Sequence, residues 1–127
     1  MKNKLRKIVV DNLEYLYTVT DTFHPGTETN TLTVKIFLIG KKQFPLSIDF
    51  LTFDDYIMGQ PLKSGVSLVN TTTNSTENVN LNEPQYIRKF ILLGRENGWT
   101  GENILERQNG VQYLANLGFE IEKLKPV

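Results

Sequence analysis

Apolar and polar residues alternate along the first part of the chain with the period of two that is typical of β-strands. The clearest run covers residues 31–39, and its apolar positions on one face are Leu32, Val34, Ile36 and Leu38. A second run at residues 44–50 also places four apolar residues on one face: Phe44, Leu46, Ile48 and Phe50. Weaker runs at residues 5–10 and 15–20 precede them. Together these runs predict a four-stranded antiparallel meander over residues 5–51, with one buried face and one exposed face.

A long helix is predicted for residues 83–98. Asn82 has a side chain that can cap this helix, Pro84 suits its first turn, and Gln85 completes a capping box. The Asn-Gly pair at residues 97–98 is a stop signal, because glycine readily adopts the left-handed conformation that ends a helix. Since the sheet has one apolar face, the helix is expected to cover it with a stripe that consists of Ile87, Phe90, Ile91 and Gly94.

A shorter helix is predicted for residues 111–117, with Leu114 on its inner side and Gly118 at its end. The alternative is a hairpin whose turn is the Asn-Gly pair at residues 109–110. With the helix, the predicted fold class is α+β: a four-stranded antiparallel meander covered on one face by one long C-terminal helix plus a shorter helix. The whole chain of 127 residues is expected to be a single domain, because this length is sufficient to bury one core.

The alternating pattern is lost between the sheet and the long helix. Residues 52–82 form a long polar stretch, and residues 70–82 consist mostly of Asn, Thr, Ser and Glu. Loops longer than about 12–15 residues are usually functional or disordered. This segment is therefore expected to be a mobile surface loop that the fold does not need, because it contains few apolar residues that could anchor it. The helical part of the chain then occupies residues 83–118.

Charge and composition exclude several classes of protein. The chain carries 14 basic and 14 acidic residues, and this zero net charge argues against nucleic acid as the main partner. It contains no cysteine, which removes thiol catalysis, disulfides and thiolate metal sites. The basic N-terminus is followed by a short apolar run at residues 8–10, whereas a signal peptide needs roughly 7–15 apolar residues. No segment approaches the apolar length of about 18 residues that suggests a membrane span, so the expected location is the cytoplasm.

Two motifs frame the chain. The first is the opening IVVDNLEYLYTV at residues 8–19, and the second is a helix that has Pro84 and Ile87 near its start and Gly98-Trp99 at its end. In both motifs the chain resembles a group of small uncharacterised bacterial proteins. In that group a sheet precedes a helix that ends in Gly-Trp, often with a proline two residues later, where this chain has a glycine. The resemblance implies the fold and offers no activity, so it assigns no functional residues.

Few residues of the chain could carry catalysis. His24 is the only histidine, and it stands in a His-Pro-Gly turn. The sequence has no Gly-x-Ser-x-Gly motif that could supply a catalytic serine, so His24 is expected to be a surface residue. Asp49, Asp54 and Asp55 lie close in sequence and could supply a hard-metal site or an acid/base pair. They lack the spacing of a calcium loop, and an Asp-Asp pair is equally typical of a turn at the end of a strand. The pattern therefore predicts no cofactor and no metal.

The exposed face of the predicted sheet is the candidate binding site. Leu16 and Phe37 stand on it among polar residues, and an apolar centre with a polar rim is typical of an interface. The candidate binding residues are Leu16, Lys35, Phe37 and Asp49. They favour a non-catalytic protein-interaction module, such as an immunity or accessory protein. Two alternatives stay open: a small-ligand carrier with a tyrosine-lined pocket between sheet and helix, and a metal-dependent enzyme that uses the aspartates.

Overall fold

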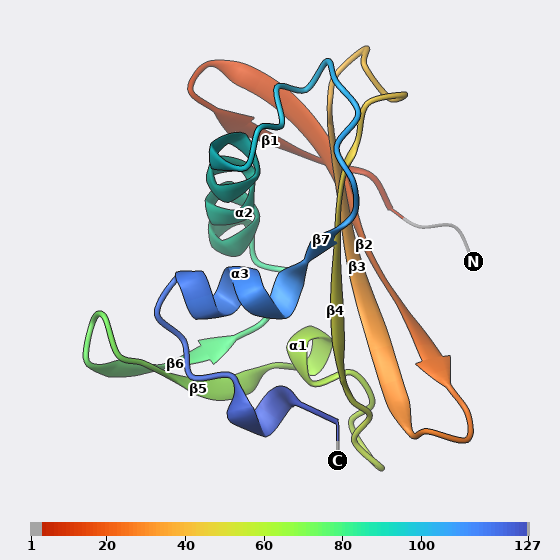
Figure 1. Cartoon of the computed structure of the whole chain (residues 1–127), viewed down its shortest axis with the longest axis vertical. Coiled ribbons are helices and arrows are strands. Elements are labelled where there is room, and N and C mark those ends of the chain that lie inside the picture. Colours follow the sequence, from red (N-terminus) through yellow and green to blue (C-terminus); the bar gives the residue numbers. More distant parts are fainter. Residues whose placement is uncertain (1–3, 127) are drawn as a thin grey trace.

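A sheet of five strands forms one layer of the molecule, and the helices lie along one of its faces (Figure 1). The computed structural model describes residues 4–126. The strands of this sheet are β1 (Arg6–Val10), β2 (Leu13–His24), β3 (Thr29–Leu38), β4 (Leu46–Phe53) and β7 (Gln108–Asn109). They are arranged in the order β1-β2-β3-β4-β7, and the first four form the antiparallel meander that the alternation predicts. The α+β class and the mostly antiparallel sheet are thus confirmed.

The number of strands differs from the prediction. The sheet has five strands instead of four, because the chain returns past β4 and adds the two-residue β7 at its edge. β7 runs parallel to β4, with Gln108 opposite Ile48 and Asn109 opposite Asp49. A parallel pair needs a crossover connection, and the chain makes this one through the helical part of the molecule. The sheet is therefore mixed at this edge.

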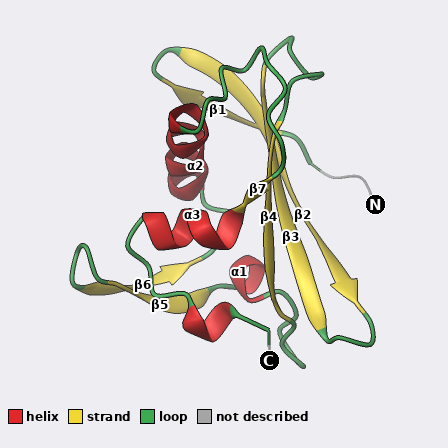
Figure 2. Cartoon of the chain, viewed as in Figure 1, coloured by secondary structure: helices red, strands yellow, loops and turns green. Residues whose placement is uncertain are grey.

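The helices are short and lie on the face of the sheet that we call the inner face (Figure 2). They are α1 (Pro61–Ser64), α2 (Pro84–Glu96), α3 (Gly110–Asn116) and the 3₁₀-helix η1 (Glu122–Leu124). The prediction of one long C-terminal helix is wrong, since α2 has 13 residues and shares the inner face with α3. Among residues 4–126, no helix combines the length and the apolar character that crossing a membrane requires.

The start of α2 also differs from the predicted capping box. Glu83 occupies the N-cap position and makes no side-chain cap hydrogen bond, while Pro84 is the first helical residue as expected. The side-chain amide of Asn82 instead donates to the backbone carbonyl of Lys63, at 3.4 Å. Gln85 donates to the carboxylate of Glu83, at 2.7 Å. The amide group that could have capped the helix is therefore used to connect it to α1.

Both longer helices end in the same way, with a glycine followed by a buried aromatic residue. At the end of α2, Gly98 has a φ of 104°, and the N–H of Trp99 donates to the carbonyl of Gly94 at 2.9 Å. At the end of α3, Gly118 has a φ of 99°, and the N–H of Phe119 donates to the carbonyl of Leu114 at 3.1 Å. These bonds define a Schellman motif, which turns the chain back toward the helix. The predicted stop of the long helix is thus confirmed, and so is the shorter helix over the alternative hairpin.

The core lies between the inner face of the sheet and the helices. The sheet residues and helix residues predicted to meet there are fully buried, namely Leu32, Val34, Ile36, Leu46, Ile48, Phe50, Ile87, Phe90 and Ile91, while Leu38 is half-buried. The ring of Phe90 on α2 lies 5.4 Å from that of Phe50 on β4 and 6.2 Å from that of Tyr113 on α3, measured between ring centroids. The predicted buried face of the sheet is therefore confirmed, with Leu38 at its margin.

The segment predicted to be a long polar loop is structured. It contains α1 and a hairpin of β5 (Val66–Asn70) and β6 (Ser75–Val79), so the prediction of an unstructured loop across residues 52–82 is wrong. The apolar residues scattered through it anchor it to the core: Leu62, Leu68, Val79 and Leu81 are all buried. Asn70 is also buried, and its side-chain amide donates to the carbonyl of Leu117 at 3.2 Å. Anchors at both ends of the hairpin hold this segment in place.

Candidate functional site

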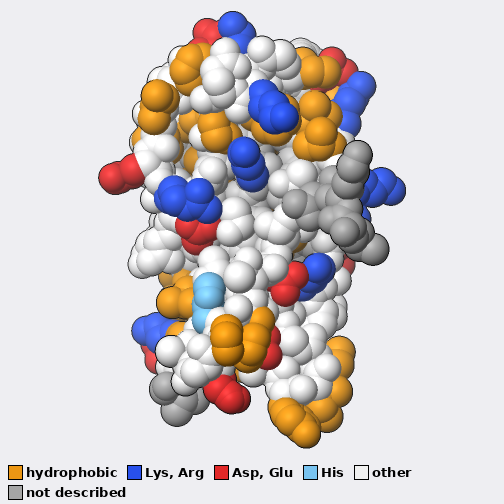
Figure 3. All heavy atoms as spheres, turned by 90° about the vertical axis from the view of Figure 1, so that its right-hand side faces the viewer, with side chains coloured by type: hydrophobic (Ala, Val, Ile, Leu, Met, Phe, Trp, Pro, Cys, Tyr) orange, Lys and Arg blue, Asp and Glu red, His pale blue; other side chains and the backbone are white. Residues whose placement is uncertain are grey.

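The face of the sheet opposite the helices, which we call the outer face, is not covered by any helix of residues 4–126 (Figure 1). Figure 3 shows this face, with apolar side chains toward its upper and lower ends and charged side chains scattered among neutral polar ones between them. Pairing between strands arranges its residues in rows, which are Leu16–Phe37, Thr18–Lys35–Ser47 and Thr20–Thr33–Asp49. The four predicted binding residues therefore share one face and occupy three consecutive rows.

The apolar row of this face is less accessible than the sequence suggests. Phe37 lies on the outer face, but its side chain is only 6% exposed, so the expectation that it projects into solvent is wrong. Leu16 is its direct cross-strand partner and is itself partly buried. Opposed apolar side chains on neighbouring strands shield each other from water, and this pairing stabilises the sheet. The accessible part of the predicted site is therefore centred on Lys35, which is exposed.

Asp49 is held by three hydrogen-bond donors at the edge of the outer face. Arg107 donates from Nε to Oδ2 at 2.6 Å and from Nη2 to Oδ1 at 2.7 Å, which makes the pair bidentate. Thr33, in the same row, donates from Oγ1 to Oδ1 at 2.7 Å. Arg107 reaches Asp49 because it directly precedes β7, whose Asn109 is paired with Asp49. No pattern in the sequence points to Arg107, since its position depends on that two-residue strand.

These contacts change the acidity of Asp49. The hydrogen bonds from Arg107 are the main cause that holds the pKa of the Asp49 carboxyl below its ordinary value. Partial burial of the carboxylate acts in the opposite direction, and the hydrogen bond from Thr33 adds to the lowering of the pKa. Asp49 is therefore ionised, and Arg107 balances its charge. It is poorly suited to act as a general acid or base near neutral pH.

We expect the substitution Arg107→Ala to raise the pKa of Asp49 toward the value of about 3.9 that is found in model peptides. Because the folded-state pKa of Asp49 is lowered, the stability that the pair contributes is present above the unfolded-state pKa and is lost as the pH falls through the folded-state pKa. The pair is partly exposed, so this contribution is only about 0–1 kcal/mol. Carboxyl-carbon NMR titration measures the shift. A smaller rise is expected for Thr33→Val, and an unchanged pKa in Arg107→Ala would contradict the assignment.

A shallow pocket of about 430 Å³ lies beside this ion pair. Its lining residues come from β4, β7 and the start of α3, and they are Asp49, Leu51, Arg107, Gln108, Asn109 and Val111. The pocket combines amide groups with two apolar side chains, while its carboxylate and guanidinium are already bound to each other. It can therefore offer hydrogen bonds and apolar contact to a binding partner, but it brings no activated nucleophile or base.

The aspartates proposed for a metal site do not converge. Asp49 faces outward on β4, Asp54 accepts a hydrogen bond from the side-chain amide of Asn30 at 2.9 Å, and Asp55 caps a turn. His24 is bonded through Nε2 to the hydroxyl of Thr31, at 2.7 Å. In the described part of the chain, no cluster of three or more acidic or histidine side chains is placed to hold a metal ion. The geometry gives no support to the metal-dependent enzyme.

The interior holds a polar network at the end of the sheet near α1. Gln60 donates from Nε2 to Oδ1 of Asn30 at 3.0 Å and accepts at Oε1 from the hydroxyl of Thr52 at 3.1 Å. All three residues are buried. Within residues 4–126, no buried side-chain nitrogen or oxygen lacks a hydrogen-bond partner. Because the network is satisfied internally, its role is to fix the position of α1 against the sheet.

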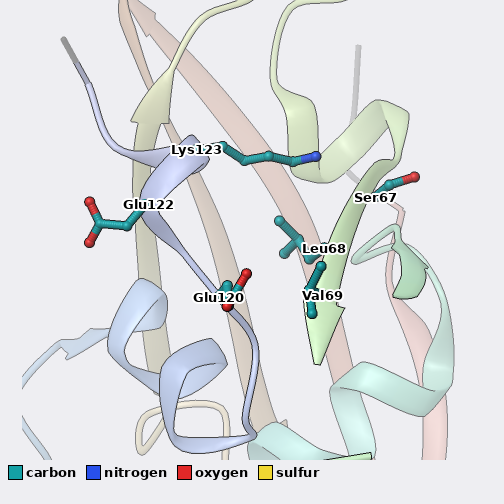
Figure 4. A pocket seen from close by; sticks show the side chains of 6 residues that line it. All are labelled: Ser67, Leu68, Val69, Glu120, Glu122 and Lys123. Carbon is teal, nitrogen blue, oxygen red and sulfur yellow. The ribbon is translucent and has the colours of Figure 1, made fainter. Parts of the chain in front are cut away.

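A second pocket, of about 190 Å³, lies between β5 and the C-terminal segment (Figure 4). Lys123 extends across it, whereas Glu122 points away from it. Ligand pockets usually measure about 300–1,000 Å³, so this one is small for a carrier. The predicted tyrosine-lined pocket is filled instead, since Tyr15 and Tyr17 are buried in the core and the ring of Tyr15 lies 5.8 Å from that of Trp99. The space between sheet and helix in which a ligand-binding pocket was predicted is therefore occupied by the core.

Comparison with known proteins adds nothing to this picture. No protein-family model, no curated protein and no solved structure matches the chain. The resemblance to small bacterial proteins that end a helix in Gly-Trp therefore stays a prediction. The fold and the surface define a small α+β domain with one covered and one uncovered sheet face.

Proposed function

We propose that the protein acts without catalysis, by binding a protein partner through the outer face of its sheet. The observation that carries this proposal is the one-sided placement of the helices, which leaves this broad face free of helical cover (Figure 1). A small ligand is usually enclosed by a concave pocket, whereas another protein is recognised over a wide and nearly flat area. The outer face has the second kind of shape, since its pocket is shallow and lies at one edge.

The chemistry of the outer face also supports a protein partner. Its middle rows consist of short hydroxyl side chains that flank the exposed Lys35, and hydroxyls can both donate and accept hydrogen bonds. Threonine and serine lose little rotamer freedom when a partner fixes them, so the cost of ordering this surface is low. The bidentate pair of Asp49 and Arg107 borders these rows as a fixed polar edge. A polar middle beside a charged edge is compatible with the polar composition of a non-obligate interface.

We expect Lys35→Glu to weaken binding of the partner by about tenfold or more, and Ser47→Arg, in the same row, to do the same by adding bulk. Proteins captured by the wild-type chain from a lysate of its own cells would be purified, and their affinity for each variant measured by calorimetry. The control is Arg88→Glu, which makes the same change of charge at an exposed position of α2 on the other side of the molecule.

Wild-type affinity in both outer-face variants, or equal loss in Arg88→Glu, would contradict the proposal. So would a measurable turnover that Asp49→Asn abolishes, because the surface is proposed to act without catalysis. Phe37→Asp is unsuitable for this test, since Phe37 is 6% exposed and an aspartate there would place a charge in a buried site. Thermal melting of each variant provides the check that the fold is unchanged.

A further inference from the structure

The loop between β4 and α1 presents three consecutive apolar side chains to solvent. Tyr56 is 99% exposed, Ile57 is 83% exposed and Met58 is 60% exposed, and we call these three residues the 56–58 tip. In Figure 1 this yellow-green loop is at the lower end of the molecule, beside the turn that joins β2 and β3. Isolated exposed apolar residues are common, whereas a contiguous and protruding group of them marks a site of interaction.

The conformation of the 56–58 tip is fixed by hydrogen bonds at its base. Asp55 and Gly59 exchange two backbone bonds, with N···O distances of 2.8 and 2.9 Å. The Oδ1 atom of Asp55 also accepts from the N–H of Ile57 at 2.9 Å and from that of Met58 at 2.8 Å. Gly59 completes the turn with a φ of 76°, which other residues rarely adopt.

This local bonding prepares the 56–58 tip for an apolar environment. The N–H groups of Ile57 and Met58 are already satisfied by Asp55, so removing them from water leaves no unpaired donor. The turn is also ordered before any partner is present, which reduces the entropy lost on binding. Tyrosine adds a large amphipathic ring, and this residue type is enriched among those that dominate binding energy.

Three carboxylates lie at or near the base of the 56–58 tip. Asp55 belongs to the turn, Asp54 precedes it, and the N–H of Asp54 donates to the carbonyl of Glu28 at 3.0 Å, which brings the β2–β3 turn alongside. Asp21 shares the side-chain amide of Asn30 with Asp54. Lys63 is paired with Asp21, at 2.8 Å. Three carboxylates and one ammonium make this base acidic, which opposes contact with anionic lipids and favours a basic protein surface.

We propose that the 56–58 tip is a preformed anchor that inserts into an apolar pocket of a partner protein whose rim carries Lys and Arg side chains. Tyr56 supplies the main contact, and the carboxylates at the base of the tip meet the basic rim. This anchor lies at the end of the sheet and uses none of the residues that test the outer face. Failure of one proposal therefore leaves the other standing.

The test compares the wild-type chain with the triple variant Tyr56→Ser, Ile57→Ser and Met58→Ser. The matched control is Ile104→Ser, because Ile104 is 84% exposed in the loop between α2 and β7, at the upper end of Figure 1. Proteins that the wild type and the control enrich from a cell lysate, and that the triple variant does not, are purified for calorimetry. The triple variant is expected to bind them at least about 100-fold more weakly, and Tyr56→Ser alone about tenfold more weakly. Higher salt is expected to weaken wild-type binding several-fold.

Several results would overturn the anchor. The first is a triple variant that keeps every partner of the wild type, or a wild type that enriches no protein through the tip. The second is binding that salt does not weaken, which would exclude the basic rim. Tip-dependent binding to vesicles of phosphatidylcholine and phosphatidylglycerol would instead assign the tip to lipid. Tip-dependent self-association in sedimentation equilibrium would assign it to a second copy of this chain. The triple variant should melt like the wild type, because the three side chains face solvent.

Discussion

Phe90→Ala is expected to lower the free energy of unfolding by about 3–5 kcal/mol. The side chain of Phe90 is fully buried on α2 and contacts the rings of Phe50 on β4 and Tyr113 on α3. Its removal therefore leaves a cavity where the sheet and two helices meet, and the neighbouring rings on β4 and α3 cannot easily collapse into it. Urea unfolding measures the loss, as a lower midpoint at an unchanged dependence on denaturant.

A matched truncation on the same helix is Leu92→Ala. Leu92 is 41% exposed, so this change is expected to alter the free energy of unfolding by only about 0.5 kcal/mol. Comparable losses at the two positions would show that α2 presents a different face to the sheet. A loss of a few tenths of a kcal/mol for Phe90→Ala would overturn the packing of the core described above.

Gly110→Ala is expected to lower the free energy of unfolding by about 1–3 kcal/mol, as inserted volume in a packed core usually does. A Cβ at this position would lie 2.5 Å from three carbon atoms of the Phe50 ring. The ring is buried and packed against Phe90, so it has little room to retreat. The clash is expected to dominate, because Gly110 is the first residue of α3, where alanine gains less over glycine than the roughly 1 kcal/mol it gains inside a helix.

Gly94→Ala provides the comparison for this prediction. A Cβ at Gly94 would also lie 2.5 Å from a neighbouring atom, but that atom is Cδ2 at the end of the flexible Leu46 side chain. A change of rotamer can relieve this contact, so the loss of stability should be smaller than for Gly110→Ala. Thermal unfolding of both variants measures the difference. A Gly110→Ala variant as stable as the wild type would show that α3 does not approach β4 as closely as described.

The parts of the fold that could be predicted are those encoded by neighbouring residues. The alternation of Leu32, Val34 and Ile36 depends only on the pleat of one strand, and their burial is complete. The turn between β1 and β2 is also locally encoded, because Asp and Asn tolerate positive φ, and Asp11 and Asn12 have φ values of 51° and 66°. Local preferences of this kind depend only on residues that are close in sequence, so they can be recognised without knowledge of the tertiary contacts.

The parts that could not be predicted depend on contacts between distant segments. β7 consists of two residues, and nothing in Gln108 or Asn109 indicates a strand until β4 is beside them. β6 has the sequence STENV, which is polar enough to look like a loop, and only its last residue is buried. Asn82 has the residue type of a helix cap, but its amide group bonds to the carbonyl of Lys63 instead.

The candidate site also has one part that the sequence predicts and another that depends on contacts between distant segments. The shared face of Lys35 and Asp49 follows from alternation within β3 and β4, so the sequence could place both residues. The bidentate partner of Asp49 could not be found, because Arg107 arrives through the pairing of β7. The exposure of Tyr56 could not be predicted either, because an aromatic residue is usually buried. Only the closed turn from Asp55 to Gly59 places its side chain in solvent.

The order of elements along the chain has a consequence for synthesis on the ribosome. The four strands of the meander are neighbours in sequence and leave the ribosome first, whereas α1, α2 and α3 all follow β4. At about 5–20 residues per second, the apolar side of the nascent sheet waits several seconds for its cover. A nascent chain is therefore expected to expose this apolar surface until α2 and α3 have emerged, which makes this stage of synthesis the one most prone to aggregation.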